Sequence, residues 1–127
     1  MQHPHHAVTE FHEAFGLMVN SAPALPDTAT RDLRKKLLAE EYTEYTTAEA
    51  EDDIVEIADA LADLIYIACG TAVAYGIPLD RVFAEVHRSN MAKLVDGKVI
   101  RREDGKVLKP AGWTPPDVAG ILGLQTN

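Results

Sequence analysis

The sequence predicts an all-α fold, a four-helix bundle that ends in a short C-terminal hairpin or turn segment. Apolar residues recur at helical spacing in four segments, and Gly, Pro and polar residues separate these segments. The connections are short, as in a bundle. With 127 residues, of which 46% are hydrophobic, the chain can bury one core but not two. We therefore expect a single domain over residues 1–127, with its core over about 7–109 and a Pro-rich tail over 110–127.

The first two helices are separated by a polar stretch that contains prolines. Apolar residues at helical spacing predict the first helix over residues 7–19, and the stretch over residues 20–30 ends it. Thr28 or Thr30 can cap a second helix, because a threonine hydroxyl accepts hydrogen bonds from the free N–H groups of a first turn. This second helix is expected to end near residue 50.

Two further helices are predicted from their boundary residues. Asp52 and Asp53 supply the acidic first turn of a third helix, which stops at Gly76. Pro78 suits a first helical position and opens a fourth helix that ends near Lys93.

The segment after the fourth helix has the composition of tight turns. Two Asp-Gly pairs, at Asp96 and Asp104, flank the β-branched pair Val99-Ile100. They predict a small hairpin or two tight turns before the Pro-rich tail.

The net charge of −8 limits the choice of partners. Nucleic acids and anionic membranes both need basic surface, so an acidic chain is not expected to bind either of them. The first twelve residues contain no apolar run of signal-peptide length, and three carboxylates interrupt the longest apolar stretch, over 54–75. We expect a cytoplasmic protein that borrows positive charge from a metal when it handles phosphates.

Basic residues are concentrated in one segment of the chain. Between Lys93 and Lys109 there are six basic and three acidic residues, so this segment carries +3 and the remainder −11. A site for a metal and a phosphate chain needs such a distribution, although a solvated basic loop would produce it equally well.

Carboxylates on the second helix occupy positions where core residues are expected. On a helical wheel of about 100° per residue, one stripe holds two leucines, two glutamates and an alanine, namely Leu33, Leu37, Glu40, Glu44 and Ala48. Glu41 lies beside this stripe. The two leucines set the inward-facing side, so we expect the glutamates to face inward as well, unless the helix extends past the core.

The third helix carries a single acidic line on an otherwise apolar surface. Glu56, Asp59 and Asp63 lie within about 60° of one another. A helix that is apolar on nearly all sides is a buried one, and we expect a dimer or tetramer to cover part of it. Ionised carboxylates held together in such a place need a cation. Basic residues are scarce around both acidic segments, and oxygen ligands favour Mg²⁺ or Mn²⁺. A di-iron bundle would require Glu-x-x-His motifs, which this sequence lacks.

These residues form a pattern that resembles a known family. Glu40-Glu41-Tyr-Thr-Glu44, followed by Glu56-Ile-Ala-Asp59, is similar to the EExxE…ExxD signature of the MazG-like all-α nucleotide pyrophosphohydrolases, relatives of phosphoribosyl-ATP pyrophosphohydrolase and the dimeric dUTPases. The stretches 58–66, 85–93 and 102–109 are similar to the subset described as phosphoribosyl-ATP pyrophosphohydrolase-like or MazG-like. The resemblance covers roughly residues 11–109.

The resemblance implies hydrolysis of a nucleoside or deoxynucleoside triphosphate between the α- and β-phosphates, usually with Mg²⁺, to a monophosphate and pyrophosphate. It implies metal ligation by four carboxylates: Glu41, Glu44, Glu56 and Asp59. Glu40 would either complete a second metal site or take the proton of the attacking water. Whether Asp63 is also a ligand stays open.

Four residues near the C-terminus are candidates for substrate binding. Asn90 and Lys93 continue the apolar stripe of the fourth helix, where they would contact a base or sugar and a phosphate, or else only cap the helix. Arg102 and Lys106 are candidate phosphate ligands, but basic residues on turns are solvated at least as often. Trp113 would stack on a base or simply pack.

Two other functions stay open. The same signature would serve a phosphoribosyl-ATP pyrophosphohydrolase of histidine biosynthesis, which a purine-nucleotide assay would distinguish. A non-catalytic helical interaction module, in which the acids only line a partner-binding groove, would bind no divalent ion.

Overall fold

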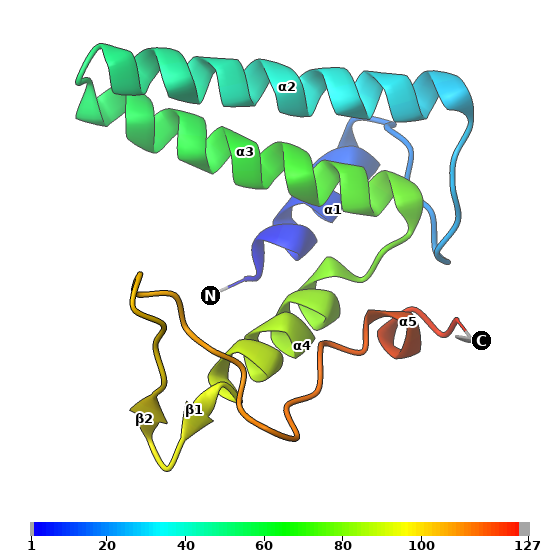
Figure 1. Cartoon of the computed structure of the whole chain (residues 1–127). Helices are drawn as coiled ribbons and strands as arrows, with labels where there is room; N and C mark the ends of the chain where they lie inside the picture. The colour runs from blue at the N-terminus through cyan, green and yellow to red at the C-terminus, as the bar shows by residue number, and fades with distance from the viewer. Residues whose placement is uncertain (1, 125–127) are drawn as a thin grey trace. The chain divides into compact units, whose positions relative to one another are not determined.

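The computed structural model describes residues 2–124 of the chain and is mostly helical (Figure 1). Its residues divide into two compact units, one ending at Leu79 and one beginning at Asp80. The first contains the helices α1 (Pro4–Ala14), α2 (Thr28–Ala50) and α3 (Ile54–Tyr75). The helix α4 (Leu79–Met91) begins at the boundary, and the second unit continues with β1 (Leu94–Val95), β2 (Lys98–Val99) and α5 (Val118–Ile121). The predicted all-α fold, with four main helices and a short hairpin, is confirmed; the single domain stays a prediction.

Helix α1 ends at Ala14, five residues earlier than predicted. Gly16 has a φ of +69°, in the left-handed region that glycine adopts without a steric penalty. The N–H of Leu17 then reaches back to the carbonyl of His12 at 2.8 Å, which closes a Schellman motif. The apolar spacing beyond Gly16 therefore belongs to a loop.

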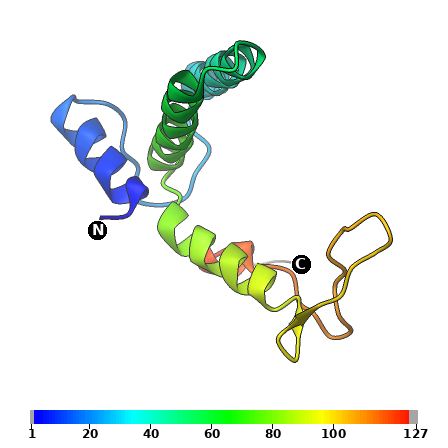
Figure 2. The same cartoon turned by 90° about the vertical axis from the view of Figure 1, so that its left-hand side faces the viewer.

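Acidic residues lie at both ends of α2 and in the turn that joins it to α3. Helix α2 begins after Asp27, not at a capping threonine, and the Thr30 hydroxyl donates to the Asp27 carboxylate. At its other end α2 stops at Ala50, close to the predicted position. Asp52 adopts a φ of +53°, and the Asp53 carboxylate caps α3 by accepting the Glu56 N–H at 3.1 Å. The sequence thus places α2 and α3 side by side in a helical hairpin (Figures 1 and 2).

Helix α3 is the centre of the first unit, because both α1 and α2 pack against it. A small core holds Val8 of α1 against Cys69 and Val73 of α3, with Leu79 beside them. Gly76 ends α3 with a φ of +70°, and a Cβ at this position would lie 2.2 Å from the Ala22 carbonyl oxygen. The C-terminal half of α3 is therefore tightly enclosed.

The N-terminal half of α3 is not enclosed within this chain, although the sequence predicted a buried helix. Large apolar side chains are exposed along it, from 75% for Ile54 to 40% for Tyr66. By length and composition alone α3 could span a membrane, a test that the core helix of a soluble protein also passes. Three carboxylates, Glu56, Asp59 and Asp63, lie along this half, and carboxylates are costly inside a membrane.

The side of α2 that faces α3 agrees with the predicted stripe at Glu44 and Ala48 but differs from it at its start. Leu33 is 52% exposed, whereas Arg34 is 91% buried. The guanidinium of Arg34 donates to the Ile67 carbonyl at 2.9 Å and to the Thr71 hydroxyl at 3.1 Å. Every seventh residue of a helix returns to nearly the same side, so Glu41 and Ala48 face α3 as Arg34 does.

The second unit begins with α4 and the predicted hairpin. Strands β1 and β2 are antiparallel, with Leu94 opposite Val99. Asp96 and Gly97 both have positive φ, at 50° and 73°, as a two-residue type I′ turn requires. Around the second Asp-Gly pair the chain forms only an isolated bridge between Arg101 and Val107. One hairpin and one looser turn therefore replace the two alternatives that the sequence left open.

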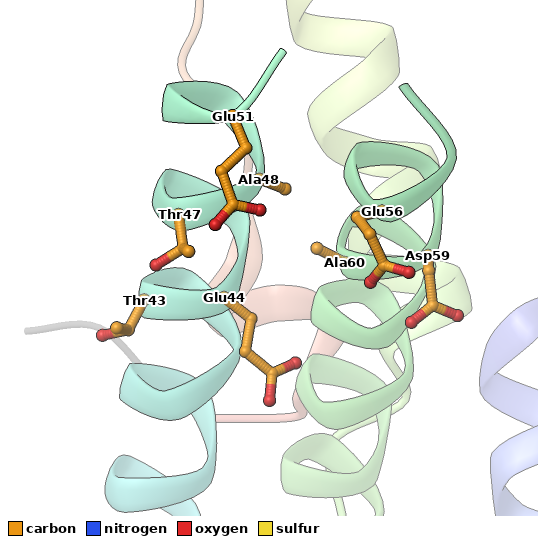
Figure 3. Close-up of a pocket in the computed structure, with 8 residues that line it drawn as sticks. All are labelled: Thr43, Glu44, Thr47, Ala48, Glu51, Glu56, Asp59 and Ala60. Atoms are coloured by element: carbon orange, nitrogen blue, oxygen red, sulfur yellow. The ribbon is translucent and has the colours of Figure 1, made fainter. Parts of the chain in front are cut away.

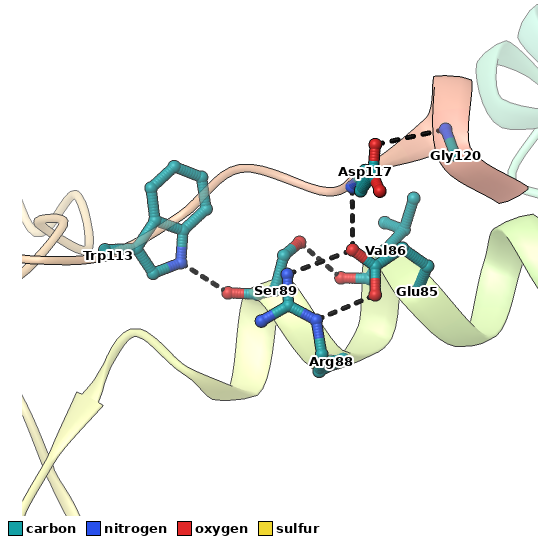
Figure 4. Close-up of polar contacts among 7 residues, drawn as sticks. All are labelled: Glu85, Val86, Arg88, Ser89, Trp113, Asp117 and Gly120. Carbon is teal, nitrogen blue, oxygen red and sulfur yellow. Dashed lines mark hydrogen bonds and ion pairs between the residues drawn. The ribbon is translucent and has the colours of Figure 1, made fainter. Parts of the chain in front are cut away.

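The tail returns along α4 and is held there by side-chain contacts (Figure 4). The indole Nε1 of Trp113 donates to the Ser89 carbonyl at 2.6 Å. The N–H of Asp117 donates to the Glu85 carboxylate at 2.7 Å, and Arg88 makes a two-pronged ion pair with the same carboxylate. Asp117 also caps the short helix α5, an element that the sequence analysis did not predict.

Candidate metal centre

Carboxylates from α2 and α3 converge in the helical hairpin of the first unit. Glu41 and Glu44 lie about one turn apart on α2, and Asp63 lies on the facing helix. One oxygen from each of these three residues lies within 4.8 Å of the others. The hairpin thus provides three oxygen donors at the spacing of a metal site, with two of them from one helix.

The pKa values of Glu41 and Asp63 are both raised in this cluster. Burial raises the pKa of Glu41, and the hydrogen bond and charge of Glu44 and the charges of Asp63 and Asp59 raise it further. Burial also raises the pKa of Asp63, followed by the charges of Asp59 and Glu44 and a hydrogen bond with Asp59. Both shifts mean that the fold holds negative charges against their mutual repulsion.

Glu41 also has an oxygen without a partner. Its Oε2 is buried and, within residues 2–124, makes no hydrogen bond. Lysine and arginine form ion pairs with other carboxylates, among them Asp32, Glu85 and Asp104. A buried carboxylate oxygen without a partner is costly, and a bound cation would satisfy it.

A cavity of about 220 Å³ adjoins this cluster between α2 and α3. Glu44 extends from α2 toward α3, while Glu56 and Asp59 lie next to each other on α3 (Figure 3). Ala48 and Ala60, both 3% exposed, lie between the helices at this level. Their small side chains let the two helices approach closely, so that the acids of both helices line one space.

The predicted ligands therefore fall into two overlapping groups. Glu41 and Glu44 meet Asp63, the residue that the sequence left open, while Glu56 and Asp59 share the cavity with Glu44. The donor set is entirely carboxylate oxygen, which fits Mg²⁺ or Mn²⁺.

Glu40 lies apart from the three-oxygen cluster. Its side chain is exposed, and with Glu44 and Lys36 it lines a shallow cavity of about 460 Å³ on α2. Lys36 is thus a basic residue close to the acidic residues of α2, where the sequence indicated that such residues are scarce. The spacing of four residues between Lys36 and Glu40 would have indicated that the two share a side of the helix.

The four candidate substrate-binding residues belong to the second unit. Lys93 donates to the Asn90 side-chain oxygen at 3.1 Å, and Asn90 itself is exposed. Arg102 forms an ion pair with Asp104, and its N–H donates to the Lys106 carbonyl at 2.8 Å. The structure therefore brings them together in two pairs, each near in sequence.

A comparison with protein families identifies the chain. The model described as phosphoribosyl-ATP pyrophosphohydrolase matches residues 8–90, more than half of the sequence. The chain belongs to the phosphoribosyl-ATP pyrophosphohydrolase family. A search of curated proteins finds no match.

Membership of the phosphoribosyl-ATP pyrophosphohydrolase family confirms the resemblance to the MazG-like superfamily and supports an enzyme with a nucleotide pyrophosphohydrolase activity. The matched range includes α2, α3 and every carboxylate of the candidate metal centre. It also includes Asn90 but ends before Lys93, so the whole basic segment lies outside the part that defines the family.

Proposed function

We propose that this chain is a Mg²⁺-dependent hydrolase that cleaves a nucleoside or deoxynucleoside triphosphate to the monophosphate and pyrophosphate. The observation that carries this proposal is the convergence of Glu41, Glu44 and Asp63, with a buried oxygen of Glu41 left without a partner. The family match supports the reaction class, because its members are pyrophosphohydrolases by description.

Three carboxylates hold the metal in this proposal, and the neighbouring acids assist them. Glu41, Glu44 and Asp63 provide the first set of oxygens, and Glu56 and Asp59 hold a second ion or the water around the first. A bound divalent ion neutralises phosphate charge and makes a water molecule easier to deprotonate. Glu40, which is exposed beside Glu44, accepts the proton of the attacking water or completes a second metal site.

Basic residues of the second unit neutralise the phosphate chain. Lys93 and Arg102 already contact Asn90 and Asp104, so binding requires them to exchange these neighbours for phosphate oxygens. Lys106 adds a third positive charge and Asn90 contacts the base or the sugar. Such charge neutralisation is the main demand of phosphate chemistry.

The family match favours a second candidate, hydrolysis of phosphoribosyl-ATP in histidine biosynthesis. The bond broken is again the one between the α- and β-phosphates, so the same carboxylates would serve. The two candidates differ in the phosphoribosyl group that phosphoribosyl-ATP carries on its nucleotide, so the carboxylate cluster alone does not distinguish them.

We also propose that the enzyme is a homo-oligomer, either a dimer or a tetramer. The exposed apolar side chains of α3, among them Ile54, Val55 and Ile65, support this, because a monomer would leave them in water. Sedimentation at micromolar concentration that finds only monomer would contradict the proposal.

The test is a substrate panel with Mg²⁺ that includes canonical triphosphates, modified triphosphates and phosphoribosyl-ATP. Pyrophosphate and orthophosphate are measured separately. We expect pyrophosphate as the first product, from a triphosphate more rapidly than from phosphoribosyl-ATP; the reverse order would establish the second candidate. Orthophosphate as the first product would contradict both, and a chain that binds no divalent ion would be the non-catalytic module.

A further inference from the structure

The second unit contains a cavity of about 400 Å³ that the proposed metal site does not use. It is lined by the residues that follow α4, by the start of the hairpin and by the returning tail. Most of these residues are apolar, among them Leu94, Val95, Pro110 and Trp113, and Asp96 is the one carboxylate among them. The cavity volume falls in the range of small-molecule sites.

Trp113 gives this cavity a fixed aromatic wall. Its indole N–H bonds to the Ser89 carbonyl at 2.6 Å, and its backbone N–H bonds to the Pro110 carbonyl at 3.1 Å. The ammonium groups of Lys93 and Lys109 lie 5.6 and 5.0 Å from the centroid of its ring. Both ammonium groups lie over the ring, so Trp113 offers an aromatic surface with positive charge next to it.

We propose that this cavity binds the nucleobase of a nucleotide, with Trp113 as the stacking surface and the two lysines attracting phosphate. The inference rests on the proposed function for the class of ligand and names the base that the site prefers. Anchoring of the tail explains the bond to Ser89. It does not explain a cavity of this size with Asp96 in its lining and two ammonium groups over the ring.

Asp96 determines which base fits. An ionised carboxylate only accepts hydrogen bonds, so it favours an edge that donates. Guanine presents a ring N–H beside an amino group and can donate twice. Adenine and cytosine donate through one amino group, whereas uracil presents carbonyl oxygens on both sides of its single N–H and is repelled. The expected order of affinity is guanine first, adenine and cytosine next, and uracil last.

The experiment uses the fluorescence of Trp113, the single tryptophan of the sequence. The whole chain is titrated without Mg²⁺ with GMP, AMP, CMP, UMP and ribose 5-phosphate. We expect saturable quenching that is strongest with GMP and absent with ribose 5-phosphate. Equal quenching by all four nucleotides, or quenching by none, overturns the proposal.

Asp96→Asn tests the carboxylate without disturbing the turn, because Asn-Gly is the preferred pair of a type I′ turn. We expect the preference for GMP over UMP to fall about tenfold, the scale of a bidentate base contact. Glu103→Gln is the matched control, since it removes a carboxylate of the same segment that does not line the cavity, and it leaves the preference unchanged. A preference that survives Asp96→Asn overturns the assignment.

Lys109→Met distinguishes the contribution of the base to binding from that of the phosphate. It should weaken GMP binding several-fold and leave guanosine binding unchanged, and equal weakening of both would contradict the role given to the lysine. Pyrophosphate release is measured on the same preparations with Mg²⁺. Hydrolysis without base-dependent quenching overturns this inference alone, whereas quenching without hydrolysis overturns the proposed function alone.

Discussion

The acidic cluster of the first unit and the charged residues of the second unit are arranged in opposite ways. In the first, Glu41, Glu44 and Asp63 are gathered together, and their closest charged neighbours are other acids. In the second, charged groups pair over short distances, as Arg88 does with Glu85 and Arg102 with Asp104. Opposite charges that form an ion pair stabilise each other, whereas like charges held close together need a bound cation to offset their repulsion.

The direction of the pKa shifts separates the two situations. Burial and neighbouring acids raise the pKa of Glu41 and Asp63. Hydrogen bonds from Arg88 and from the Asp117 backbone lower the pKa of Glu85 to about 2, and those from Arg102 and the Lys106 backbone lower the pKa of Asp104. The same residue types thus mark a candidate site in one unit and a folding contact in the other.

The largest effect is expected when a carboxylate of the cluster is neutralised. Glu41→Gln, Glu44→Gln and Asp63→Asn keep the shape of the side chain but remove a metal-binding charge. Each should lower kcat/KM for pyrophosphate release by about 100-fold or more, the scale of removing one stabilising group from an active site.

Asp32→Asn is the control for these variants, since Asp32 is an exposed carboxylate of the same helix that pairs with Lys35. It should change kcat/KM less than about twofold, as surface ion pairs contribute little. If Asp32→Asn and Asp63→Asn have similar effects, the contrast between paired and unpaired acids fails as a guide to the site.

A second prediction compares a turn from each unit. Gly76→Ala places a Cβ against the Ala22 backbone at a φ of +70°, whereas Gly97→Ala meets nothing within 4 Å at a φ of +73°. Backbone strain costs about 1–2 kcal/mol in either case, and overpacking adds about 1–3 kcal/mol at Gly76 alone. Urea unfolding should show this difference; equal losses would mean that the end of α3 is less enclosed than its contacts indicate.

The parts of each unit that the sequence predicts are those whose structure depends on one or two neighbouring residues. The boundaries of α3 depend on Asp53 and Gly76, which sequence alone identifies, and the hairpin depends on the Asp96-Gly97 pair. The end of α1 differs from the predicted one because the apolar spacing continues past Gly16, whereas the helix ends just before this glycine. Helix α5 was missed because its four residues are too few to show any period.

The candidate site was predictable in composition but not in detail. The clustering of acids followed from their spacing on two helices. The inward side of α2 followed only in part, because Ala48 is buried as the stripe predicts, whereas Arg34 and not Leu33 is buried at its start. A buried arginine that bonds to a backbone carbonyl and a threonine is a tertiary arrangement that no residue pattern reveals. That difference of one position decides between Glu40 and Glu41 as the acid nearest to Asp63.

A third prediction uses metal-free stability to test that difference. Glu41→Gln should raise the melting temperature in the presence of a chelator, because it relieves repulsion that the fold maintains. Mg²⁺ should then stabilise this variant less than the parent, since a ligand that binds only the folded state stabilises it more the more tightly it binds. Glu44→Gln and Asp59→Asn should behave similarly.

Glu40→Gln is the matched comparison, because Glu40 is adjacent in sequence but exposed. It should leave the metal-free melting temperature almost unchanged. If the metal-free melting temperature rises for Glu40→Gln and not for Glu41→Gln, then Glu40 faces α3, as the stripe of leucines predicted. An equal Mg²⁺ response in the parent, Glu44→Gln and Asp59→Asn would remove the metal site altogether.

The smallest effect is expected at Glu85, where the same substitution should act in the opposite direction. Its pKa falls from 4.5 to about 2 on folding, so its charge stabilises the folded state above pH 4.5 and this contribution is lost as the pH falls toward 2. Glu85→Gln should therefore be less stable than the parent at neutral pH, and the difference in unfolding free energy should shrink between pH 4.5 and 2. Glu103→Gln, which removes a carboxylate from the same unit, should show no such trend. If Glu85→Gln instead stabilises the chain, as Glu41→Gln is expected to do, then paired and unpaired acids do not differ in the way that separates the two units.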